Sequence, residues 1–156
     1  MRPDRIIVGE VRGKEAFDMM QAMNTGHDGS LTSVHANGAK DAIKRLETMV
    51  LMDGLDIPVN AIREYVNDAL DLGVHIARMN DGRRKITDIS EVITGKNGTI
   101  ELVNIFKFEL DNKDTNIVQG EYILQDYVPV CLEKILNAGI NDLDDMFKKK
   151  NEKNKE

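Results

Sequence analysis

Several features are scarce in this sequence of 156 residues, and each shortage limits what the protein can be. Its single cysteine, Cys131, has no CxxC or histidine-rich surroundings, so we expect a small buried apolar residue rather than a nucleophile or metal ligand. No apolar stretch approaches the roughly 20 residues that a membrane helix needs, and no apolar signal region is present. We therefore expect a soluble, cytosolic protein whose core is large enough to fold without disulfides.

Basic residues are fewer than acidic ones, 21 Lys and Arg against 27 Asp and Glu. The formal net charge is −6 and the pI is about 5.1, which argues against a general nucleic-acid binder because such proteins normally carry a basic face. The basic residues gather locally, in "DGRRK" (81–85) and in "KKKNEKNKE" (148–156). We predict that residues 148–156 form a disordered, solvated tail.

The hydrophobic pattern changes its period along the chain. Before residue 71 it predicts a buried strand (5–9), a helix (14–24) that stops near Gly26, a second strand (30–35) and two helices (38–52 and 58–70). In residues 73–80, 84–94 and 99–110, apolar and polar residues then alternate or apolar residues run together. The turns "NDG" and "GKNG" separate these segments, which is typical of an antiparallel meander. A less regular segment (116–125) and helices over 130–137 and 142–149 complete the prediction. The order indicates an α/β core followed by antiparallel strands.

Two phosphate-binding motifs are missing. The sequence contains no GxxxxGKS or GxxxxGKT loop, so it lacks the backbone cradle and lysine with which P-loop enzymes hold β- and γ-phosphates. It also lacks GxGxxG, and "GKNG" (95–98) is better explained as a hairpin turn. If the chain does nucleotide chemistry, it carries part of a site.

Glu10 ends the first predicted strand, and Arg12 follows two residues later. Ligand sites of open α/β sheets collect at the carboxyl ends of strands, where a rigid carboxylate can orient a magnesium-bound water. Glu10 could equally be an exposed residue that begins a turn. Arg12 could neutralise a phosphate or form a structural ion pair with Glu10.

The three histidines offer further candidates. His35 ends the second predicted strand, where a neutral imidazole could donate to a terminal phosphate, although a structural role is also open. His27 lies in "TGHDGS", whose glycines permit close approach to a ligand, and His75 falls on a meander strand. No two of them have metal-ligand spacing, so we predict no metal site made by the protein alone.

The stretches "RPDRIIVGEVRG" and "EAFDMMQAMNTGHDGSLTSVHANGAKDAIKRLETMVLM" resemble the C-terminal RecA-like part of the secretion and pilus ATPases, nearest to the tight-adherence (Flp-type pilus, CpaF-like) assembly ATPases. The resemblance is dense from Arg2 to about Asp71 and weaker through "PVCLEKILNAGINDLDDMF". It implies a partial RecA-like P-loop NTPase core over residues 1–127 with the meander, C-terminal helices over 128–147 and the tail over 148–156.

The resemblance also implies roles for individual residues. "IIVGE" corresponds to the Walker B segment, so Glu10 would be catalytic and would reach nucleotide-bound Mg²⁺ through water. "TGHDGSLTSVHAN" corresponds to the His-box region, with His35 as its phosphate-sensing histidine. Arg12 falls on the family's GEVR arginine. Glu10, Arg12, His27 and His35 are thus the expected nucleotide-binding residues, with ATP and Mg²⁺ as the implied cofactors.

Members of that family form hexameric rings that couple ATP hydrolysis to pilin movement at an inner-membrane platform. We expect this chain to correspond to the C-terminal portion of such an ATPase, inactive alone because the P-loop and Asp-box are absent, and peripheral to the inner membrane when assembled. The alternative is a non-enzymatic interaction or scaffold module of the same machinery. An unpaired edge on the 5–9 strand would also favour dimers or larger assemblies.

Overall fold

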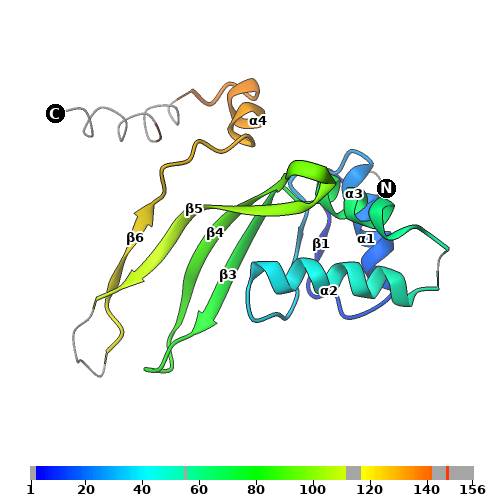
Figure 1. Ribbon diagram of the computed structural model, residues 1–156. Helices are drawn as coiled ribbons and strands as arrows, with labels where there is room; N and C mark the ends of the chain where they lie inside the picture. Colours follow the sequence, from blue (N-terminus) through cyan, green and yellow to red (C-terminus); the bar gives the residue numbers. More distant parts are fainter. Residues whose placement is uncertain (1–2, 55, 112–116, 142–146, 148–156) are drawn as a thin grey trace. The chain divides into compact units, whose positions relative to one another are not determined.

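The computed structural model describes residues 3–54, 56–111, 117–141 and 147 (Figure 1). The chain divides into two compact units. The first unit comprises Met1–Asp71 and Val92–Leu102, and the second comprises Leu72–Glu91 and Val103–Glu156. Each unit is described separately below. The predicted division into residues 1–127, 128–147 and 148–156 stays a prediction.

The first unit combines a short parallel strand pair with packed helices. Strands β1 (Ile7–Val8) and β2 (Leu31–Thr32) pair in parallel, and α1 (Glu15–Asn24), α2 (Ala39–Met52) and α3 (Val59–Ala69) follow the predicted helical ranges closely. Helix α1 ends where predicted, because Gly26 takes the left-handed conformation (φ 89°). The strands are shorter than predicted, with regular pairing over two residues each.

The helices bury one shared apolar core in the first unit. Their inward residues recur every three or four positions, as the sequence pattern predicts. The buried cluster consists of Val11, Ala16, Met19, Met20, Ile43, Leu46, Met49, Val50, Ile62, Val66 and Val92. Val11 is 1% exposed, so the loop that carries the candidate residues Glu10 and Arg12 is anchored directly in this core.

The prediction that the first strand is buried on both faces is wrong for Ile7. Its side chain is 75% exposed, and Leu31, its partner across the β1–β2 pair, is 62% exposed. Directly opposed residues lie on the same face of a sheet. The face that bears Ile7 and Leu31 is therefore open in the described part of the chain, while the core lies against the half-buried Val8.

The antiparallel region forms one sheet in the order β3-β4-β5-β6 (Figure 1). Its strands are β3 (Leu72–Arg78), β4 (Arg84–Thr94), β5 (Ile100–Leu110) and β6 (Gly120–Leu124), with the 3-10 turn Lys96–Gly98 between β4 and β5. The predicted three-stranded meander is confirmed, and β6 adds a fourth strand from the segment whose pattern was less regular. Strands β3 and β4, and β5 and β6, pair antiparallel.

A buried carboxylate joins β4 to the segment before α4 (Leu132–Asn137) within the second unit. Glu91 is 2% exposed and accepts hydrogen bonds from Tyr127 Oη (2.5 Å), Val130 N (2.9 Å) and Cys131 N (2.6 Å). Burial raises the pKa of Glu91, but these hydrogen bonds outweigh it and hold the pKa below its ordinary value. Glu91 is therefore an ionised group that fixes the start of α4.

The end of the chain lies largely outside the described residues. Helix α4 confirms the helix predicted over 130–137, whereas the helix predicted over 142–149 and the tail over 148–156 fall almost entirely on residues that the structure does not describe. Within the described ranges, no helix is long and apolar enough to cross a membrane.

Candidate functional site

The β1–β2 pair brings the residues after each strand together. Backbone hydrogen bonds extend the pairing beyond the two-residue strands, from Leu31 N to Ile6 O and from Val11 N to Ser33 O, each 3.0 Å. Ser33 Oγ also donates to Gly9 O at 2.5 Å. Because the strands are parallel, their carboxyl ends lie at the same edge, and this edge carries the candidate site.

Glu10 and Arg12 lie on the same side of an extended segment. In extended backbone, alternate residues point the same way, and the residue between them, Val11, points into the core. The Arg12 Nη2 atom lies 2.5 Å from Glu10 Oε2. Of the two roles that the sequence left open for Arg12, the ion pair with Glu10 is thus present, and this pair leaves Glu10 Oε1 for a second partner.

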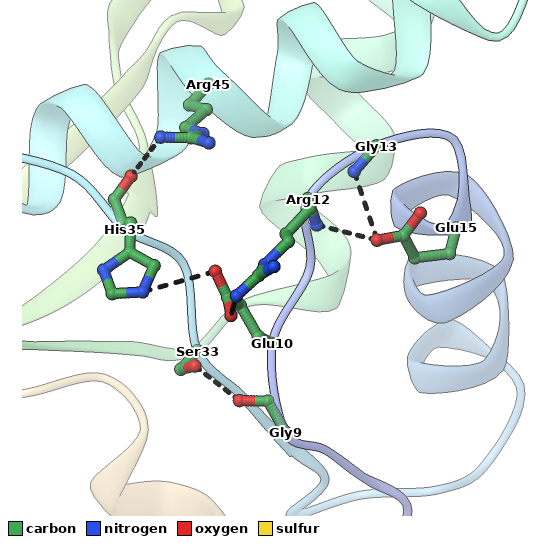
Figure 2. A network of polar contacts seen from close by, with 8 residues as sticks. All are labelled: Gly9, Glu10, Arg12, Gly13, Glu15, Ser33, His35 and Arg45. Carbon is green, nitrogen blue, oxygen red and sulfur yellow. Dashed lines mark hydrogen bonds and ion pairs between the residues drawn. The ribbon is translucent and has the colours of Figure 1, made fainter.

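That second partner is His35 (Figure 2). Its Nε2 atom lies 3.3 Å from Glu10 Oε1, across the strand pair. The Glu10 side chain is 23% exposed, whereas those of Arg12 and His35 are 73% and 79% exposed. The structure therefore brings together three of the four predicted site residues, with the carboxylate partly buried and its two partners open to solvent.

Glu15 shapes the turn that follows Arg12. As the first residue of α1, it accepts hydrogen bonds through Oε1 from the backbone N–H groups of Arg12 (2.7 Å) and Gly13 (3.1 Å) (Figure 2). The bond from Arg12 is the largest cause of a lowered pKa at Glu15. Glu15 thus satisfies backbone donors just before the helix and holds the Arg12 backbone in place.

The electrostatics of the site favour an ionised Glu10. The hydrogen bond from Arg12 has the largest effect and lowers the pKa of Glu10, burial opposes it, and the charges of Arg12, His35 and Arg45 lower it further. The same bond raises the pKa of Arg12. At neutral pH, Glu10 is therefore a carboxylate with more than one cationic neighbour.

Arg45 is a neighbour that the sequence analysis missed. It lies on α2, and its Nη1 atom donates to the backbone oxygen of His35 at 2.8 Å (Figure 2). In the sequence it is one of several charged residues on the polar side of a strongly periodic helix, so the pattern gave no reason to single it out.

The remaining histidines take part in other contacts. His27 Nδ1 lies 2.9 Å from Ala22 O, near the end of α1, and His27 O accepts a hydrogen bond from Ser30 Oγ. No contact recorded among the described residues joins it to Glu10, so its nucleotide-binding role stays a prediction. His75 lies on β3, as predicted, with Nδ1 2.7 Å from Thr87 Oγ1.

The donor set fits a nucleotide-bound magnesium ion. Mg²⁺ prefers oxygen ligands and keeps several waters, and Glu10 supplies an ionised carboxylate. Arg12, His35 and Arg45 supply N–H donors of the kind that bind phosphate oxygens. No cluster of three or more His, Cys, Asp or Glu side chains suited to a metal is found in the described part of the chain.

Comparison with known proteins places the chain among secretion-system proteins. Residues 1–72 match the family model described as "Type II/IV secretion system protein". The comparisons thus support the type II/IV secretion ATPase family that the sequence resembles.

Individual relatives come from conjugation and secretion systems. Conjugal transfer protein TrbB of Rhizobium radiobacter is 43% identical over 84 residues, which are 54% of this chain and 25% of that protein. Type IV secretion system protein VirB11 of Brucella suis biovar 1 is 38% identical over 95 residues, which are 59% of this chain and 26% of that protein.

A solved structure supports the fold. The crystal structure of the VirB11 ATPase from the Brucella suis type IV secretion system, in complex with sulphate, matches with a TM-score of 0.55 and 36% identity. The match covers 58% of this chain and 28% of that one. The mixed α/β fold is therefore similar to part of a VirB11 ATPase and is consistent with a partial RecA-like core. The chain spans 25–30% of the length of curated relatives that it matches.

Proposed function

We propose that this chain supplies the carboxylate and histidine side of the nucleotide site of a secretion ATPase. The observation that carries the proposal is the 3.3 Å approach of His35 Nε2 to Glu10 Oε1 across the β1–β2 pair. Glu10 would orient a water of nucleotide-bound Mg²⁺, and His35 would respond to the terminal phosphate. Arg12 would contact a phosphate and give up part of its ion pair with Glu10. The phosphate cradle would come from a segment outside these 156 residues.

The finer role follows the sequence resemblance. We propose that the parent machine is a hexamer of the tight-adherence pilus branch, placed at the inner face of the cell membrane, where it would couple ATP hydrolysis to movement of pilin or another substrate. The family match over residues 1–72 supports the class of machine. The branch and the hexamer rest on the resemblance.

A chimera tests the catalytic role. In the Brucella suis VirB11 ATPase, the residues that this chain matches are replaced by those of this chain, and ATP hydrolysis and nucleotide affinity are measured. Glu10→Gln should lower turnover by at least about 100-fold while affinity stays unchanged, because the substitution removes the carboxylate but keeps its shape. Glu64→Gln is the matched control, since Glu64 is exposed on α3. Normal turnover in the Glu10→Gln chimera would refute the role.

The isolated chain provides a second test. Titration calorimetry with Mg-ATP should detect no binding, because the sequence has no P-loop motif to hold the phosphates. Binding that Glu10→Gln abolishes would show that the chain holds nucleotide by another route, and the partial-site proposal would then be wrong.

The exposed pair Ile7 and Leu31 favours a second candidate, a non-enzymatic interaction module of the same machinery. The two candidates differ in their sensitivity to substitution. If the chain is an interaction module, Ile7→Ser should abolish assembly of the secretion machinery in cells, while Glu10→Gln should not affect it. If the chain is part of a catalytic site, Glu10→Gln should also stop assembly of the machinery.

A further inference from the structure

Arg45 connects helix α2 to the candidate site through the backbone of His35. Its Nη1 atom donates to His35 O at 2.8 Å, although the two residues lie ten positions apart in sequence. The contact is made to the main chain, so it restrains where residue 35 lies and leaves the imidazole available for other partners.

His35 needs such a restraint. Strand β2 ends at Thr32, so His35 lies beyond the regular pairing with β1, and its side chain is 79% exposed. An exposed side chain on unpaired backbone normally samples several positions. Its Nε2 atom lies 3.3 Å from Glu10 Oε1, and a restraint on the backbone at residue 35 would favour this position.

The other end of the contact is rigid. Arg45 lies on α2 between Ile43 (8% exposed) and Leu46 (2% exposed), which are part of the buried core. A guanidinium presents its donors in a fixed planar fork. Arg45 therefore extends from a firmly packed helix to the exposed side of the site.

We propose that Arg45 is a positioning residue that holds His35 against Glu10, so that the position of α2 controls the contact between the predicted phosphate-sensing histidine and the catalytic carboxylate. The positioning itself does not depend on nucleotide. Its importance for turnover rests on the function proposed above.

The experiment measures the contact directly in the full chain. NMR relaxation of the His35 imidazole reports its order, and the carboxyl carbon of Glu10 reports the Glu10 pKa. Arg45→Gln should lower the order parameter of the His35 ring and shift the pKa of Glu10 upward. The control is Arg63→Gln on α3, because Arg63 pairs with Glu47 of α2 (3.4 Å) and should change neither readout.

A second background separates positioning from simple charge. The Arg45 charge also lowers the Glu10 pKa directly, whereas positioning would act only through His35. With His35→Ala present, Arg45→Gln should therefore shift the Glu10 pKa by less than in the wild-type chain. Equal shifts in the two backgrounds, or an unchanged His35 ring order, would overturn the proposal.

A conservative substitution keeps the test informative if Arg45→Gln disturbs the fold. Arg45→Lys keeps the charge and one donor, so it should restore part of the His35 order lost in Arg45→Gln; no restoration would count against positioning. These readouts need no nucleotide. Normal turnover in the Glu10→Gln chimera would thus refute the catalytic proposal without affecting the positioning role of Arg45. An unchanged His35 ring order in Arg45→Gln would refute the positioning role without affecting the catalytic proposal.

Discussion

The buried Glu91 carboxylate gives the sharpest stability prediction. Oε2 accepts from Tyr127 and Val130, and Oε1 accepts from Cys131. Glu91→Gln keeps the side-chain shape but replaces one acceptor oxygen with an NH₂ donor. One of the three donors is then left facing another donor, and the other two bonds lose the benefit of a charged acceptor.

The expected loss can be worked from these contacts. A buried donor without a partner costs about 1–3 kcal/mol, and a hydrogen bond to a charged group is about 1 kcal/mol stronger than a neutral one. With two weakened bonds, the total is about 3–5 kcal/mol, in the range for breaking a buried charged network. Urea unfolding at pH 7 should show this loss, and hydrogen exchange should show faster opening of residues 127–137.

The pH dependence has a definite sign. The pKa of Glu91 in the folded chain lies below its ordinary value of 4.5, so the stabilisation is fully present above pH 4.5 and disappears as the pH falls through the lower folded pKa. The difference between wild type and Glu91→Gln should shrink over that window. Glu109→Gln, at an exposed position on β5, is the control and should change stability by less than about 0.5 kcal/mol. A loss below 0.5 kcal/mol for Glu91→Gln would refute the reasoning.

Three further substitutions test other parts of the fold. Ile62→Ala should lower the free energy of unfolding by about 2–5 kcal/mol in urea titrations, because Ile62 is 1% exposed in the helical core; a loss below 1 kcal/mol would contradict that packing. Gly120→Ala should disrupt the β5–β6 pair, since a Cβ there would overlap Glu109 O; unchanged hydrogen exchange in β6 would contradict this. Chiefly through its bond from Arg83, the Asp81 pKa falls from 3.8 to about 2. Its stabilisation should therefore be present above pH 3.8 and vanish as the pH falls towards 2, and thermal unfolding of Asp81→Asn at several pH values should show this window.

Helices were easier to predict than strands. The apolar spacing located α1, α2 and α3 to within about a residue, because each buries one face in the same core. The apolar run at residues 5–9 predicted a strand correctly, but it did not predict which faces of that strand are exposed. Ile7 is exposed because burial depends on which chain segments cover the strand, and a local pattern does not contain that information.

The site could be predicted only in part, because a local pattern does not show every contact between elements. Glu10, Arg12 and His35 follow strands, so their convergence could be expected from parallel pairing. Arg45 could not be singled out because it is one of several charged residues on the polar side of α2. Glu91 could not be singled out because its partners lie 36 to 40 positions away. For Glu91, the one available signal was an acidic residue directly before Val92 within the predicted strand 84–94.

The two-residue ladder between β1 and β2 also makes the site sensitive to insertions and deletions. Ile7 pairs with Leu31 and Val8 with Thr32, and each residue of a strand advances the chain by about 3.3 Å. A slip of one position would displace His35 along the strand by as much as its entire 3.3 Å separation from Glu10. Insertions or deletions between residue 9 and residue 30 are therefore compatible with the site only if that alignment is kept.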